Sequence, residues 1–341
     1  MQSSNSVGTA RGKAGHRVET KVSIDATKIR RHSAADALVY ADEVLGDSTN
    51  WFPSLVAYRL ASEFQADWKT EVGCWLLLAR DQGFLRPLVK RLGRALGDAP
   101  NPSVIGPNDS AHRLLLQELA PAMTAYYLTG MGWTFEAWEP AVSGGDADVR
   151  LASPCGVRTD VQVKAPDQPG DRENGQIVDG EFDERVLVST DRAMAQLHTS
   201  PCPGRLVVVS PQRIGSFRGG VLASHVVGRQ VLRRGVRGVT QESRGRFASE
   251  IGGGISAVAS LNLVRGEEET LYRCTVIRNP WLRAPIGELS TASFPHSRVL
   301  SMEQGIFSWH PEPPRDGLFP TGTPYLDSAV ALRSSITDTD Q

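Results

Sequence analysis

The chain has 341 residues, of which 40% are hydrophobic and 22% are charged, and its formal net charge is -1. These values are typical of a folded globular protein and exclude a chain that is disordered throughout. No stretch approaches the ~20 consecutive apolar residues of a membrane span, and the N-terminus lacks a secretory signal pattern, so we expect a cytoplasmic protein. The four cysteines lie far apart without a CxxC pair, which argues against a disulfide framework or a structural zinc site.

The N-terminal third of the sequence has two parts. Residues 1–34 are rich in Ser, Gly, Thr and charge, which predicts a flexible tail. Residues 35–105 predict a helical subdomain, because their apolar residues recur at helical spacing. The expected helices cover Ala37–Leu45, Leu55–Phe64, and two runs at Trp75–Ala79 and Phe84–Leu96. The segment 97–109 is rich in Pro and Gly and indicates a domain boundary near residue 105.

A helix followed by short strands is predicted next. Ser110 can cap a helix whose apolar positions continue to Tyr127 despite Pro121, and Gly130 and Gly132 end it. After this helix, the spacing of apolar residues changes from a helical period to that of short extended segments, which glycines and prolines separate. These predicted strands are Trp133–Pro140, Asp148–Ala152 and Val157–Ala165.

The rest of the chain predicts further helices and strands. A polar loop over residues 166–183 precedes a helix at Glu184–Leu197 and a buried strand at Arg205–Ser210. Another helix is expected at Val221–Arg233, a strand hairpin at Ile255–Val264 and Thr270–Ile277, and a short docked helix at Leu326–Leu332. We therefore expect an α/β domain over residues 106–310 and a C-terminal tail over 311–341.

Polar residues alternate with valines in the third predicted strand. Asp160, Gln162 and Lys164 share one face, while the valines between them point into the core. If the preceding strand pairs antiparallel with this one, the carboxylate of Asp148 approaches Gln162 and Lys164. A carboxylate, an amide and an ammonium group are then expected to converge.

This combination suits metal-assisted hydrolysis of a phosphodiester. Mg²⁺ prefers oxygen ligands, which Asp148, the side chain of Gln162 and the main-chain carbonyl of Val163 can provide. Lys164 would orient the attacking water or stabilise the developing negative charge. Glu118, on the preceding helix, is a further candidate ligand or general base.

The pattern resembles the PD-(D/E)xK nuclease superfamily, in which an acidic helix precedes a strand meander that carries Asp and then (D/E)xK. Asp148 matches the first acid, and Gln162, Val163 and Lys164 match the second motif in the QxK variant of Mrr-type restriction endonucleases. The resemblance covers residues 110–210. It implies a restriction-endonuclease-like core, with a mixed central sheet flanked by helices. It also implies Mg²⁺-dependent cleavage of DNA, with Mn²⁺ as a substitute, in bacterial restriction, phage defence or repair.

One compositional fact supports the site, and other interpretations stay open. Lys164 is the only lysine between residues 91 and 341 of an Arg-rich chain. The polar residues of this strand can instead form a solvated face, and Asp146 or Asp148 can serve the turn after Gly145. Asp160 is a weaker candidate for the site. Gln162 in place of an acid also fits a catalytically inactive module that binds nucleic acid or a protein partner.

A basic segment is the candidate surface for DNA. Residues 201–247 contain nine arginines and a single acid, Glu242, although the whole chain is nearly neutral. Such local segregation of charge can neutralise phosphates. The arginines expected to contact DNA are Arg213, Arg218, Arg229, Arg233, Arg234 and Arg237. A solvated Arg-rich surface is the alternative, and the choice between DNA and RNA stays open. A nuclease that cuts both strands of DNA often works as a dimer, so we expect a homodimer or a complex with a defence-system partner protein.

Overall fold

The described part of the chain begins with helices. The structure, a computed structural model, describes residues 32–45, 62–97, 110–142, 145–166, 179–210, 219–228, 230–232, 239–241, 245–265, 270–283, 286–295, 297–303, 306–310 and 329–330. The helices ahead of the sheet are α1 (Ala34–Leu45), α3 (Ser62–Asp81), α4 (Leu85–Gly97) and α5 (Ser110–Gly130). The predicted tail over 1–31, most of the predicted helix at 55–64 and the predicted linker at 98–109 lie outside the described residues.

Helix α5 follows the prediction closely. It begins at Ser110, contains Pro121 and ends at Gly130. Gly132 then adopts a φ of 87°, in the left-handed region that favours glycine, and directs the chain into the first strand.

A mixed sheet forms the centre of the molecule. Its strands are β1 (Thr134–Trp138), β4 (Val149–Ala152), β5 (Arg158–Lys164), β6 (Gly204–Val209), β9 (Ala257–Arg265), β10 (Thr270–Arg278), β11 (Arg298–Glu303) and β12 (Ile306–His310). They lie in the order β1-β4-β5-β6-β9-β10-β11-β12. The β5–β6, β6–β9 and β10–β11 pairs are parallel and the others are antiparallel. The expectation of an α/β protein with a mixed sheet and N-terminal helices is thus confirmed.

Smaller elements complete the described fold. The short strands are β2 (Ala141–Val142), β3 (Gly145–Asp146), β7 (Gln230–Leu232), β8 (Val239–Gln241) and β13 (Ala329–Val330). Strand β2 pairs with β3, β7 pairs with β8, and β13 pairs with β10. Single 3-10 turns cover Arg246–Ala248, Gly252–Gly254 and Thr291–Ser293.

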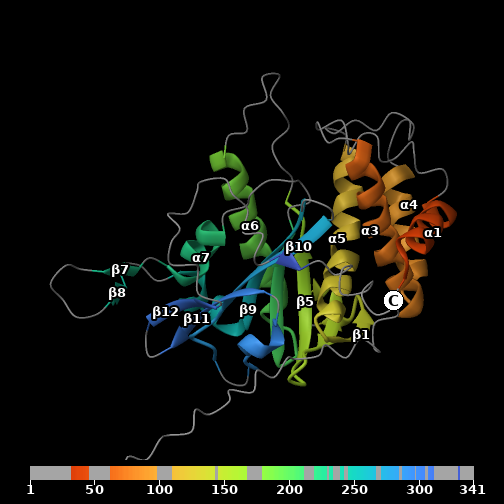
Figure 1. Cartoon of the computed structure of the whole chain (residues 1–341). Helices are drawn as coiled ribbons and strands as arrows, with labels where there is room; N and C mark the ends of the chain where they lie inside the picture. The colour runs from red at the N-terminus through yellow and green to blue at the C-terminus, as the bar shows by residue number, and fades with distance from the viewer. Residues whose placement is uncertain are drawn as a thin grey trace, which may run out of the picture.

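Helices cover both faces of the sheet (Figure 1). Helices α1, α3, α4 and α5 pack on one face, in a core that includes Trp75, Met123 and Val161. Helices α6 (Asp179–Leu197) and α7 (Gly219–Val227) pack on the other, where Met194 and Val207 contribute to a second core. Among the described helices, none combines the length and apolar character needed to cross a membrane.

Three expectations about elements were wrong, and two strands of the main sheet were missed. Helix α6 begins at Asp179, inside the segment expected to be a loop. Helix α7 ends at Val227, and Gly228, with a φ of 91°, separates it from β7. Where a docked helix was expected, Ala329–Val330 instead forms strand β13 on β10, since backbone pairing with the sheet replaces local helical bonds. Strands β11 and β12 were not predicted.

The two helical layers also exclude a solvated face on β5. Asp160 is 0% exposed and Gln162 is 4% exposed, although the alternation of the sequence allowed a solvent-facing row. Burying polar groups costs free energy unless they are hydrogen-bonded. The polar residues of β5 must therefore find partners inside the protein.

Candidate active site

The β4–β5 hairpin places Asp148 beside the second half of β5. The strands pair antiparallel, with Val149 opposite Val161. Gly156 has a φ of 80° in the connecting turn, which a residue with a side chain rarely adopts. Asp148 directly precedes β4, and its backbone N–H donates to the carbonyl of Val161 over 3.0 Å. The hairpin thus brings Asp148 to the end of β5 that carries Gln162 and Lys164.

Asp148 and Gln162 contact each other directly. Oδ2 of Asp148 accepts hydrogen bonds from Nε2 of Gln162 over 2.6 Å and from the backbone N–H of Val163 over 2.7 Å. Oε1 of Gln162 is buried and has no hydrogen-bond partner among the described residues. Buried polar atoms without a partner are rare in folded proteins. This oxygen is therefore a free acceptor inside the site.

Burial and charge shift the pKa values of Asp148 and Lys164. Burial raises the pKa of Asp148 to about 6, and this effect outweighs the hydrogen bond from Val163 and the positive charges of Lys164 and Arg91, which act in the opposite direction. Burial also lowers the pKa of Lys164, while the nearby Asp148 raises it and Arg192 lowers it. Desolvation disfavours the charged form of each group. The acid and the lysine are thus close enough to influence each other.

Arg91 and Glu139 surround Asp148 together with Glu118. Nη1 of Arg91 lies 3.2 Å from Oε2 of Glu118, and the guanidinium also pairs with Glu139. Glu139 has a φ of 47°, an uncommon value for a residue other than glycine, and its N–H donates to the carbonyl of Asp148 over 2.9 Å. The charge of Glu118 raises the pKa of Asp148. Glu118 therefore lies near the site, where Arg91 neutralises it.

A cavity of about 540 Å³ opens beside Lys164. It lies among residues of α5, β5 and α6 and the segment that follows β5. The lining residues are Gln117, Val163, Lys164, Ala165, Pro166, Glu184, Arg185, Val188, Ser189 and Arg192. Lys164 thus connects the Asp148–Gln162 contact to a cavity of the size of a small-ligand pocket.

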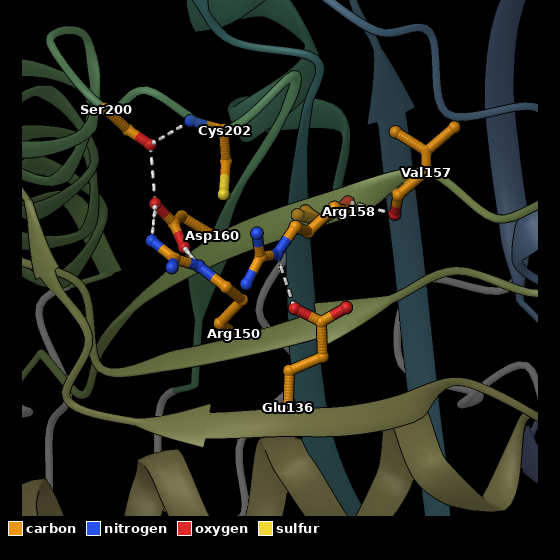
Figure 2. Close-up of polar contacts among 8 residues, drawn as sticks. Glu136, Arg150, Val157, Arg158, Asp160, Ser200 and Cys202 are labelled. Carbon is orange, nitrogen blue, oxygen red and sulfur yellow. Dashed lines mark hydrogen bonds and ion pairs between the residues drawn. The ribbon is translucent and has the colours of Figure 1, made fainter.

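Asp160 belongs to a different, structural cluster (Figure 2). Its carboxylate accepts hydrogen bonds from Arg150 over 2.6 and 3.0 Å and from Oγ of Ser200 over 2.5 Å. Ser200 in turn accepts from the N–H of Cys202 over 3.1 Å. Burial, followed by the nearby Asp160, raises the pKa of Cys202 to about 11, so this thiol is protonated and unreactive at neutral pH. Asp160 therefore ties β4 and β5 to the segment before β6.

The donor atoms around Asp148 fit a hard divalent cation. The carboxylate of Asp148, Oε1 of Gln162 and the main-chain carbonyl of Val163 are all oxygens, as Mg²⁺ prefers. The unpartnered Oε1 is what a ligand of this kind would satisfy. Among the described residues, no group of three or more His, Cys, Asp or Glu side chains is placed to hold a metal. An ion here would thus depend on amide and main-chain oxygens as well as on Asp148.

The structure brings together Asp148, Gln162 and Lys164, with Glu118 close by. The side chain of Asp146 and the arginines expected to contact DNA, Arg213, Arg218, Arg229, Arg233, Arg234 and Arg237, lie outside the described residues. Sequence reasoning missed Arg91, Glu139 and Arg192. Only Arg192 carried a usable signal, because it shares a helical stripe with Arg185 and Ser189. In comparisons with protein-family models, curated proteins and solved structures, the chain has no significant match.

Proposed function

We propose that the protein is a metal-dependent nuclease that hydrolyses phosphodiester bonds of DNA. The observation that carries the proposal is the contact of Asp148 with Gln162, next to Lys164 and with Oε1 of Gln162 left unpartnered in the buried site. A solvated strand face does not require this convergence. A cation site with a lysine beside it does.

The order of elements supports the same proposal. Helix α5 precedes the meander β1-β4-β5, and α6 then leads to β6, which lies parallel to β5. This is the order that the resemblance to PD-(D/E)xK nucleases implies, so we propose a restriction-endonuclease-like core. Restriction or phage defence in a bacterial cytoplasm is the proposed setting, and a homodimer or a defence-system protein is the proposed partner.

The roles of the residues follow from their chemistry. Mg²⁺, or Mn²⁺ in its place, would supply Lewis-acid polarisation of the phosphate and acidify a water. Ionised Asp148, Oε1 of Gln162 and the carbonyl of Val163 would hold the cation. Protonated Lys164 would donate to a phosphate oxygen and stabilise charge as the bond breaks.

A cleavage assay tests this proposal. Supercoiled plasmid and linear duplex DNA are incubated with Mg²⁺, Mn²⁺ or EDTA, and nicked and linear products are measured. We expect metal-dependent cleavage that falls roughly 100-fold or more in Lys164→Ala and in Asp148→Ala, because each removes a group that acts on the reacting phosphate. Arg158→Ala is the matched control, since this exposed residue begins β5 and pairs with Glu136. Cleavage that persists in both site variants would contradict the assignment.

A second function is favoured by Gln162 itself. An amide replaces the acid of the commoner motif, and the raised pKa of Asp148 further weakens the negative charge available to a cation near pH 6. A catalytically inactive module that binds nucleic acid or a protein partner would have these features. Binding of DNA without cleavage under every metal condition would favour this alternative.

A further inference from the structure

One face of α6 carries cations toward the cavity. Arg185, Ser189 and Arg192 are spaced by four and three residues, so they lie on one side of the helix. All three line the cavity together with Lys164 of β5. Glu184 is the acidic residue among those lining it. The cavity therefore has a positive balance, although the whole chain has a net charge of -1.

Arg192 is the most available of these cations. Its neighbour Asp191 is engaged elsewhere, with His225 over 2.8 Å and with Arg246 over 2.6 Å. Arg192 is exposed and makes no ion pair with another described residue. It nevertheless lies close enough to Lys164 for the two positive charges to affect each other. Two cations that line one cavity and act on each other's charge form a site for an anion.

We propose that Arg192 and Lys164 together bind an internal phosphodiester of the nucleic acid, with Arg192 as a substrate-binding residue on α6. The proposal rests on the function proposed above and adds a binding residue outside the basic segment considered from the sequence. Arg presents a planar fork of N–H donors that matches two phosphate oxygens, and Lys supplies a point charge. The cavity is the size of a small-ligand site, so the duplex would extend from it across the surface.

Equilibrium binding of DNA without cleavage tests this site. Fluorescently labelled duplexes are titrated with the full chain in EDTA and again in Ca²⁺, at several salt concentrations. We expect Arg192→Ala and the length-preserving Arg192→Gln to bind about tenfold more weakly than wild type, as for loss of a charge-assisted hydrogen bond. The slope of log affinity against log salt should fall by about 1. Arg158→Ala removes the same charge at the opposite end of β5, about 20 Å from Lys164 along the strand, and should bind as wild type does.

The outcomes separate this inference from the nuclease proposal. Equal affinity and equal salt slope in Arg192→Ala and Arg158→Ala would overturn it, even if wild type cleaves DNA. Weaker binding by the Arg192 variants supports it, even if no metal permits cleavage and the nuclease proposal fails. The same binding measurement is made with duplexes that carry 5′-phosphate ends and with duplexes that carry 5′-hydroxyl ends. A defect confined to the phosphorylated ends would overturn the assignment to an internal phosphodiester in favour of a terminal phosphate.

Discussion

Asp148 is half-buried and Asp160 fully buried on the same hairpin, and the two carboxylates have opposite electrostatic surroundings. Asp160 receives two hydrogen bonds from Arg150 and one from Ser200, so its charge is compensated. Asp148 receives hydrogen bonds from an amide and a backbone N–H, and burial raises its pKa to about 6. A carboxylate that destabilises the fold is a common sign of a functional site.

This contrast predicts opposite effects of two Asp→Asn substitutions on stability. Because the folded-state pKa of Asp148 is raised from 3.8 to about 6, the free energy of unfolding falls as pH rises through this window and stays lower above it. Asp148→Asn should therefore be more stable than wild type at pH 8, by up to about 3 kcal/mol, and the gain should vanish near pH 4. Urea denaturation of both proteins across this pH range measures the difference.

Asp160→Asn is the matched control for that experiment. It leaves the Arg150 guanidinium uncompensated in a site where the side chain is 14% exposed, and should cost about 3–5 kcal/mol at pH 7. If Asp148→Asn were as destabilising as Asp160→Asn at pH 8, Asp148 would be a structural residue rather than a strained functional one.

The meeting of Asp148, Gln162 and Lys164 could be expected from the sequence, because alternation and hairpin pairing are local rules. Arg91 and Glu139 could not be expected in the same way. Arg91 reaches Glu139 from α4, 48 positions earlier in the chain, and no local pattern indicates that approach. The positive φ of Glu139 likewise depends on tertiary contacts rather than on residue type.

At the scale of elements, the long segments with a clear period were predicted well. The burial of a strand beneath a helix and the shortest strand were not. Helix α5 and the β9–β10 pair follow strong local periods, and the structure contains both. The burial of both faces of β5 depends on α6 lying over it, which alternation along one strand does not reveal. Strand β13 has two residues and depends on its pairing with β10, so no window of sequence predicts it.

A buried hydrogen-bonded chain joins α3 to β10. The hydroxyl of Tyr272 donates to Glu71 and accepts from Nε1 of Trp75 over 2.7 Å, and the side chains of all three are buried. Tyr272→Phe keeps the ring but removes a donor to a buried carboxylate and the acceptor of the indole N–H. We expect a loss of roughly 2–4 kcal/mol in the free energy of unfolding, measured by urea denaturation.

Tyr40→Phe is the corresponding control on α1. The Tyr40 ring lies under Arg80, with 5.0 Å between the guanidinium carbon and the ring centroid, and its hydroxyl makes no hydrogen bond to a described residue. Its loss should change stability by less than about 0.5 kcal/mol. Equal stabilities of the two Phe variants would mean that the Tyr272 hydroxyl contributes nothing to the attachment of α3.

At the scale of the whole molecule, one of the two apolar cores is shared by the N-terminal helices and the sheet. Trp75 and Leu88 of the helices belong to the same cluster as Val161, Leu206 and Val276 of the strands. A helical subdomain that folded alone would expose its face of this cluster to water. The described helices and the sheet are therefore expected to unfold together.

Hydrogen exchange measured at increasing urea concentration tests this cooperativity. We expect peptides from α3 and from β10 to lose protection at the same urea concentration, because opening either exposes the other side of the shared core and breaks the Trp75–Tyr272 hydrogen bond. The β7–β8 pair is an internal reference, since its two short strands form a separate sheet and should exchange earlier. If α3 peptides lost protection well before those of β10, the helices would form an independent unit, and Arg91 would reach the Asp148 site only while that unit stayed docked.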